Sequence, residues 1–147
     1  MKLIVIAGLV LLGGLMGFVR LSPLDAARLE VDPEFVKTPS GAAHFLLRND
    51  GDMAPPVFEM SAGELSARLE QVILSTPRTV RLSGRLEGGV AIYVSRSVLW
   101  GFPDIASVKV IETGHGRATF NILSRSRFGG YDWGMNEARV RGWLDRL

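Results

Sequence analysis

The residues whose types and spacing favour chemistry lie near the C-terminus of this chain. Alternating serines and arginines over residues 124–127 end an expected strand, a glycine-containing loop follows, and a helix begins near residue 136. Guanidinium groups beside the free N–H groups of a helix start are typical of sites that bind phosphate or carboxylate. We therefore predict an anion site here, and its candidate ligand-binding residues are Arg96, Arg125, Arg127, Asp132, Asn136 and Arg139.

The same segment also fits a purely structural role, which the physical chemistry of these residues favours. Arg125 or Arg127 could pair with Asp132, and the glycines permit a tight turn. Asp132 or Asn136 could cap the helix that follows, because both side chains accept hydrogen bonds from free backbone N–H groups. Both interpretations stay open at the level of the sequence.

Most catalytic chemistries are excluded or unsupported. The chain has no cysteine, which excludes thiolate nucleophiles, iron–sulfur clusters and Cys-ligated zinc. Its two histidines, His44 and His115, have no ligand partners nearby in the sequence, and no nucleophile-elbow, phosphate-loop or zinc-protease motif is present. We predict no catalytic residue, no metal site and no cofactor. Nucleic-acid binding is also disfavoured, because the aromatic residues do not alternate along an exposed strand face.

The N-terminal segment predicts a membrane anchor. Residues 3–19 are uncharged and predominantly apolar, at the short end of the length that crosses a bilayer. No small-x-small cleavage pattern follows, so an uncleaved signal-anchor is favoured over a cleaved signal peptide. Lys2 and the amino terminus favour a cytoplasmic N-terminal end, whereas Arg20 and Arg28 weakly favour the opposite orientation. We predict that the domain lies on the non-cytoplasmic side of the inner (cytoplasmic) membrane. Gly13 and Gly17 form a GxxxG pair that would allow a homodimer, or they simply belong to a glycine-rich helix.

The elements that position the candidate site follow from periodicity. Ser61 and Glu64 form a capping-box pattern before an apolar stripe, which predicts a helix over 62–75. Alternating residues predict two hairpins, over 80–94 and 108–122, and a terminal helix ends the chain. The fold class is α+β: an N-terminal transmembrane helix, then a two-layer domain with a mainly antiparallel four-stranded sheet, its helices covering one face and the other face in water.

Residues that interrupt helices and strands, together with the distribution of charge, divide the chain into three segments. We predict an anchor over 1–20, a tether and irregular leader over 21–55 with one short strand near 43–48, and a compact domain over 56–147. Residues 78–147 carry eleven Lys/Arg against six Asp/Glu, whereas residues 20–77 carry five against nine. Either the acidic leader neutralises the basic domain within the molecule, or the basic domain offers a surface to anions.

The segment from Ser126 to Arg139 resembles a known family. Its sequence SRFGGYDWGMNEAR fits the pattern Ser-Arg-x-Gly-x-x-Asp-x-Gly-x-Asn-x-x-Arg of the bacterial family catalogued as domain of unknown function 1499. The upstream Gly101–Asp104 segment is also similar to that family, and the resemblance covers roughly residues 56–147. The family's Pro-Asn-Cys-Val-Ser-Ser stretch is replaced here by residues 38–43, TPSGAA. The resemblance implies no reaction.

These observations favour a membrane-anchored, non-enzymatic domain that binds or scaffolds an envelope component. Five aromatic residues are expected in loops around the strand ends, where they would form an interface or pack against the core: Trp100, Phe102, Phe128, Tyr131 and Trp133. The alternative function is recognition of a phosphate, carboxylate or lipid headgroup at the arginine-rich C-terminal motif.

Overall fold

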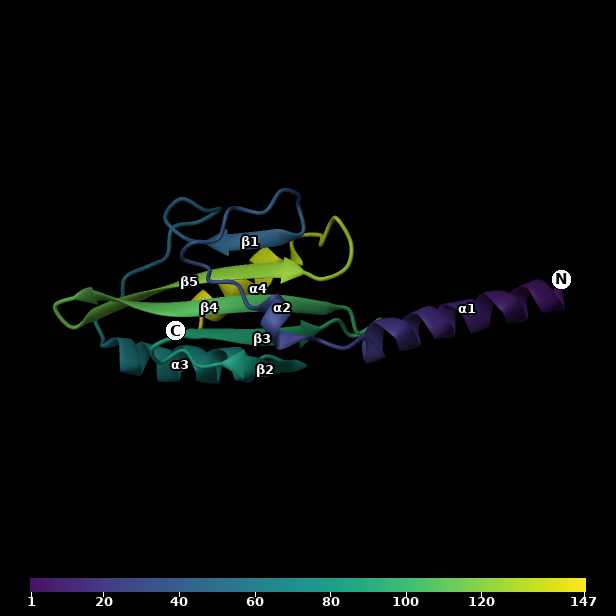
Figure 1. The fold of residues 1–147 in the computed structure, drawn as a ribbon, viewed down its shortest axis with the longest axis horizontal. Helices are drawn as coiled ribbons and strands as arrows, with labels where there is room; N and C mark the ends of the chain where they lie inside the picture. The colour runs from purple at the N-terminus through teal and green to yellow at the C-terminus, as the bar shows by residue number, and fades with distance from the viewer.

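The computed structural model describes residues 1–147 and has an α+β architecture with an N-terminal apolar helix (Figure 1). In chain order its elements are α1 (Lys2–Leu21), α2 (Ala26–Leu29), β1 (His44–Leu47), α3 (Ala62–Leu74), β2 (Thr79–Gly84), β3 (Val90–Arg96), β4 (Pro103–Gly114), β5 (Arg117–Ser126) and α4 (Met135–Leu144). The predicted anchor helix, the helix over 62–75 and the C-terminal helix are all present.

All five strands belong to one antiparallel sheet with the order β1-β5-β4-β3-β2. Both predicted hairpins are confirmed, but the prediction of four strands is wrong by one. β1 pairs with β5, from His44 opposite Arg125 to Leu47 opposite Ile122, inside the segment predicted as leader. The pairing satisfies backbone groups that β5 would otherwise expose as an edge strand. The short helix α2 also lies in that leader.

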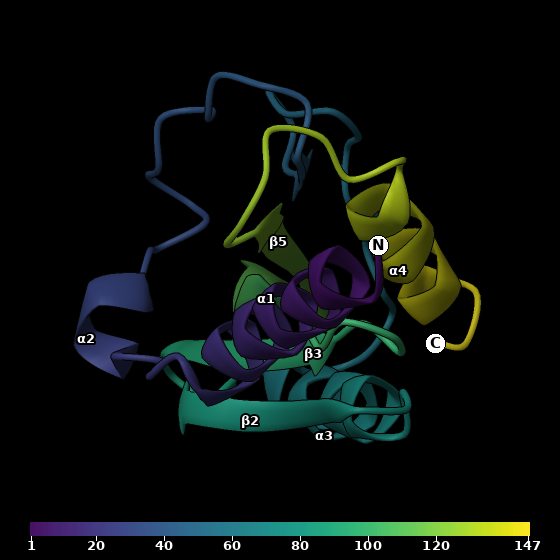
Figure 2. The same cartoon turned by 90° about the vertical axis from the view of Figure 1, so that its right-hand side faces the viewer.

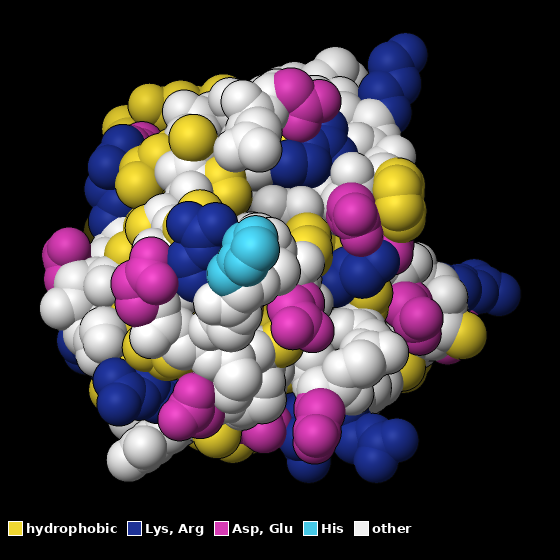
Figure 3. Space-filling view, turned by 90° about the vertical axis from the view of Figure 1, so that its left-hand side faces the viewer, with side chains coloured by type: hydrophobic (Ala, Val, Ile, Leu, Met, Phe, Trp, Pro, Cys, Tyr) yellow, Lys and Arg dark blue, Asp and Glu magenta, His cyan; other side chains and the backbone are white.

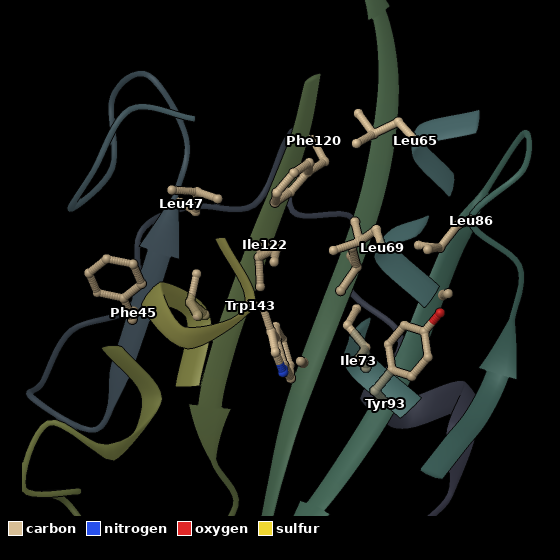
Figure 4. Packing of buried hydrophobic residues seen from close by; sticks show 14 of the residues in the cluster. Phe45, Leu47, Leu65, Leu69, Ile73, Leu86, Tyr93, Phe120, Ile122 and Trp143 are labelled. Atoms are coloured by element: carbon tan, nitrogen blue, oxygen red, sulfur yellow. The ribbon is translucent and has the colours of Figure 1, made fainter. Parts of the chain in front are cut away.

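The main core lies between one face of the sheet and the helices α3 and α4 (Figure 4). The predicted capping box begins α3, because Glu64 N–H donates to Ser61 Oγ at 3.3 Å and Ser61 N–H donates to Glu64 Oε2 at 3.0 Å. In the apolar stripe of α3, Leu65, Leu69 and Ile73 are fully buried and Val72 is partly buried. Trp143 of α4 lies beside Ile122 of β5 in the same core. Burial of these side chains is the main stabilising contribution to the domain.

The second face of the sheet is also covered, contrary to the prediction that it meets water. Ile92, Val94 and Ile105 on this face are buried beneath Leu24 and Leu29 of the leader. Figure 2 shows α2 and α4 on opposite sides of the sheet. Strand β3, which lies between β4 and β2, is therefore buried on both faces, so the domain has a third, thin layer made by residues that the sequence places in the tether.

Charge holds the leader on the sheet. The ammonium group of Lys109 on β4 lies 2.7 Å from Asp32 and 2.7 Å from Glu34. The hydrogen bond to Asp32, followed by that to Glu34, raises the pKa of Lys109. Arg48 donates to three leader carbonyls, those of Pro33, Glu34 and Val36. At Lys109, the acidic leader neutralises a basic residue of the domain within the molecule, whereas the bonds of Arg48 join two parts of the leader.

Helix α1 projects away from one end of the domain, along the long axis of the molecule (Figure 1). It is long and apolar enough to cross a membrane, with a mean hydropathy of 2.3 over its best window, and only its last turn contacts the domain, where Val19 is buried. The space around Gly13 and Gly17 is open, and a helix dimer through these glycines stays a prediction.

Candidate functional site

The C-terminal motif forms a buried polar cluster where β5 ends and where β4 and α4 begin. Asn136 stands at its centre with no exposed surface. Its amide oxygen accepts from the Ser124 hydroxyl at 2.6 Å and from Arg139 Nη1 at 2.9 Å. Its amide nitrogen donates to Asp132 Oδ2 at 2.6 Å and to Ser126 Oγ at 3.2 Å. The side chain thereby links the end of β5 to the start of α4.

Asp132 organises the start of α4 rather than an open site. Its carboxylate accepts from the backbone N–H groups of Gly134 at 3.0 Å and Asn136 at 2.9 Å, which the helix itself leaves free. The N-cap position belongs to Gly134, whose φ of 74° favours glycine. The prediction that Asp132 or Asn136 is the N-cap is therefore wrong: Asp132 lies two residues before the cap, where it still accepts from two backbone N–H groups, and Asn136 lies inside the first turn.

Asp104 completes the cluster from the Gly101–Asp104 segment. Arg139 Nη2 lies 2.6 Å from Asp104 Oδ2, and the Ser126 hydroxyl donates to the other carboxylate oxygen at 2.7 Å. The two charged side chains are only 12% and 14% exposed, for Arg139 and Asp104 respectively. A buried pair of this kind is costly to break, because the remaining charge would be left without a partner.

Arg125 and Arg127 contact the leader instead of joining this cluster. Arg125 Nη2 donates to the Leu29 carbonyl at 2.8 Å, and burial lowers the pKa of Arg125. Arg127 Nη1 donates to the Pro23 carbonyl at 2.7 Å. The two arginines that suggested an anion site therefore bind main-chain oxygens of residues about a hundred positions earlier in the chain.

Arg96 makes no hydrogen bond to the other candidates, although it shares with Asp104 and Arg139 the lining of a pocket of about 320 Å³. It also lines a pocket of about 540 Å³ together with Arg20 and Arg78, neither of which the sequence analysis selected. These three arginines come from three segments far apart in the sequence, and no motif connects them. The only signal for Arg78 and Arg96 was the excess of basic residues over 78–147, and Arg20, which lies in the acidic part of the chain, had none.

The structure thus joins three of the six candidates by hydrogen bonds, Asp132, Asn136 and Arg139. Arg125 and Arg127 bind the leader instead, and Arg96 is bonded to none of the three but lines a pocket with Arg139. The family model described as Protein of unknown function (DUF1499) matches residues 27–147. The chain belongs to this family. The DUF1499 match begins in α2 and includes β1, in agreement with the contribution of the leader to the fold. No curated protein and no solved structure matches the chain.

In this DUF1499 chain the residues that carried the resemblance hold the fold together. Asn136, Asp104 and Asp132 are all engaged by protein donors, and the cluster joins α4 to β4 and β5. No group of three or more His, Asp or Glu side chains is arranged to hold a metal ion. The arrangement fixes a helix start and a loop.

Proposed function

We propose that this chain is a single-pass membrane protein that holds a non-enzymatic α+β domain beside a bilayer, where it binds or scaffolds an envelope component. In this proposal the anchor remains uncleaved in the inner (cytoplasmic) membrane. The amino terminus stays in the cytoplasm, and the domain lies on the non-cytoplasmic side.

The observation that carries the proposal is the solvent exposure of α1. Its apolar residues are exposed on every side, including Ile4 at 77%, Leu11 at 75% and Phe18 at 64%. A helix that is apolar all round requires a nonpolar environment, and nothing in the domain provides one. At 1.5 Å per residue its 20 residues extend about 30 Å, which equals the hydrocarbon thickness of a bilayer.

The C-terminal motif supports a structural role over the alternative function. Anion recognition there would require Arg125 and Arg127 to release the carbonyls of Leu29 and Pro23. It would also require a ligand to compete with the bonds that Asn136 and Arg139 make inside the cluster. The three-layer domain depends on these hydrogen bonds. They therefore favour binding of an envelope component at the surface of the domain and not at the C-terminal motif.

Membrane insertion is tested by extraction of the full chain from membranes with alkaline carbonate. We expect the chain to resist carbonate and to dissolve only in detergent. The double variant Leu9→Arg/Leu12→Arg places two charges near the helix centre at a cost of about 6 kcal/mol, and should release the chain. Leu3→Arg is the matched control, because an arginine at the helix end reaches the interface and is tolerated. Release of the unmodified chain by carbonate would refute the anchor.

Sidedness can be measured because the chain lacks cysteine. Arg85→Cys places a single thiol in the exposed β2–β3 hairpin, and Lys2→Cys places one before the anchor. We expect a membrane-impermeant maleimide to label Arg85→Cys in intact cells whose outer layers are permeable, and Lys2→Cys only after the inner membrane is opened. The opposite pattern would place the domain in the cytoplasm.

A further inference from the structure

The pocket of about 540 Å³ lies at the end of the domain from which α1 projects. Arg20 reaches it from the last turn of α1, Arg78 from the residue before β2, and Arg96 from the end of β3. Much of the remaining wall is formed by valines, including Val80 and Val98, which are 60% and 72% exposed. The pocket therefore combines three cations with an apolar rim.

None of the three arginines has an ionic partner, and no carboxylate lines the pocket. Each is held by a carbonyl: Arg20 Nη2 donates to Leu99 at 3.0 Å, Arg96 Nη1 to Gly101 at 2.9 Å, and Arg78 Nε to Arg96 at 3.1 Å. A guanidinium has five N–H donors, so each side chain is positioned by one bond and keeps others for a ligand. Arginine forks suit the oxygens of a phosphate group.

The length of α1 places this pocket at a defined depth. If Lys2–Leu21 fills the hydrocarbon layer, Arg20 in its last turn lies among the lipid headgroups. Exposed apolar and aromatic side chains occur at the same end of the domain, with Leu99 at 66%, Tyr131 at 60% and Trp133 at 85%. Aromatic residues of this kind are enriched at the interface between a bilayer and water.

The opposite end of the domain differs. Figure 3 shows acidic and basic side chains interspersed over the surface farthest from α1. An anionic bilayer attracts clusters of arginine and is not attracted by a surface of mixed charge. The grouping of unpaired arginines beside the anchor is therefore the arrangement that an anionic membrane surface would recognise.

We propose that the pocket lined by Arg20, Arg78 and Arg96 binds the phosphate of an anionic phospholipid headgroup, so that the domain is seated on the bilayer as well as tethered to it. This inference rests on the proposed membrane anchoring. The guanidinium groups bind the phosphate oxygens, while the valine rim contacts the glycerol and the first methylene groups of the lipid.

The test uses the full chain in neutral detergent micelles, with the Nε–Hε resonances of the arginines observed by NMR. The probes are short-chain phosphatidylglycerol, short-chain phosphatidylcholine and inorganic phosphate. We expect saturable shifts at Arg20, Arg78 and Arg96 with phosphatidylglycerol and none with phosphatidylcholine. Each arginine near an anionic lipid contributes about a factor of five to binding, so Arg78→Gln should weaken it about fivefold and Arg20→Gln/Arg78→Gln about 25-fold.

Two further variants separate the pocket from net charge and from folding. Arg85→Gln removes one charge from the far hairpin, where Arg85 is exposed and unpaired, and should leave the affinity unchanged. Arg78→Lys keeps the charge and should retain more binding than Arg78→Gln, while amide spectra report whether each variant is folded. If Arg78→Gln and Arg85→Gln weakened phosphatidylglycerol binding equally, or if both phospholipids produced equal shifts, the proposal of lipid binding at the pocket would be wrong.

The remaining outcomes distinguish the source of the phosphate and the anchor. If inorganic phosphate saturated the pocket with the same affinity as phosphatidylglycerol, the assignment of the ligand as a lipid would be wrong. The ligand would then be a free phosphate. If the chain resists extraction by carbonate but shows no saturable binding of phosphatidylglycerol, the proposed lipid binding at the pocket is wrong and the membrane anchor stands. A chain that carbonate releases would overturn the anchor and, with it, the lipid assignment.

Discussion

Replacement of Asn136 by aspartate directly tests whether the C-terminal motif is a structural cluster. Asn136 is fully buried, and its amide nitrogen donates to Asp132 Oδ2 at 2.6 Å. In Asn136→Asp this donor becomes a carboxylate oxygen that faces the carboxylate of Asp132 from a fully buried position. Arg139 is close enough to offset part of the new charge, but it is already paired with Asp104. The variant therefore buries a charge that is incompletely compensated.

An uncompensated charge in a buried pair costs about 3–5 kcal/mol, and we take about 4 kcal/mol for this site. For a domain of this size that lowers Tm by about 12 °C. Asn136→Ala is the matched control, since it removes the same donor without adding a charge. Loss of the charge-assisted hydrogen bond alone should cost about 2 kcal/mol.

The pH dependence identifies the cause. Two carboxyl groups in contact cannot both ionise readily, so the folded state raises the pKa of the new carboxyl above its unfolded value. The penalty is therefore full at neutral pH and is relieved as the pH falls through the raised folded-state pKa. Asn136→Asp should approach Asn136→Ala in stability between about pH 7 and pH 5.

Thermal unfolding of the full chain in neutral detergent, followed by near-ultraviolet circular dichroism, measures these differences. The aromatic signal is suitable because the buried Trp143 and Tyr93 lie in the main core. A drop in Tm of under about 4 °C at pH 7, or a drop that is the same at both pH values, would refute the buried cluster as the reason for the motif.

Three further predictions concern the fold that carries the site. Lys109→Met leaves Asp32 and Glu34 without their cation, so protease cleavage within residues 22–36 should increase several-fold, whereas Lys37→Met, which removes an exposed unpaired lysine, should leave it unchanged. Gly84→Ala would place a Cβ 1.9 Å from the Val90 carbonyl and should lower the free energy of unfolding by about 3 kcal/mol, while Gly88→Ala, which has open space, should cost about 1 kcal/mol. The hydrogen bonds from Ser61 lower the pKa of Glu64 below its ordinary 4.5, so the stabilisation by the capping box is present above that pH and is lost as the pH falls through the lowered folded-state pKa. Denaturant titrations should show the difference between the unmodified chain and Glu64→Gln disappearing in acid, and a constant difference would contradict this cause.

The elements with strong periodicity could be predicted from the sequence. The capping box and apolar stripe gave α3 to within one residue, and alternation gave both hairpins. β1 has only four residues, and its role depends on pairing with β5, which lies far away in the chain. The five consecutive nonpolar residues from Val90 to Val94 did carry a signal of burial on both faces. A strictly alternating pattern predicts one buried face, so alternation alone does not account for this run.

The site could be predicted in part, for a reason that depends on the kind of partner. Asp132, Asn136 and Arg139 are close in sequence on one loop and helix start, so their proximity followed from spacing. The partners of Arg125 and Arg127 are main-chain oxygens. Because every residue has a main-chain carbonyl, residue types do not indicate which carbonyl accepts the hydrogen bond. The pocket with Arg20 and Arg78 depends on how α1 and β2 meet in three dimensions, which no local pattern contains.

The cluster and the pocket should respond differently to substitution, although the same loops join them. Phe102 and Phe128 lie with ring centroids 6.3 Å apart, which links the loop after β3 to the loop after β5. Asn136→Ala loosens the second loop but leaves Arg20 and Arg78 in place, so below its Tm it should keep the phosphatidylglycerol affinity of the unmodified chain. Arg78→Gln removes a lone exposed bond and should weaken the lipid while changing Tm by less than about 2 °C. If Asn136→Ala instead reduced lipid affinity as strongly as Arg78→Gln, the motif would be part of the binding surface and the separation of the two sites would be wrong.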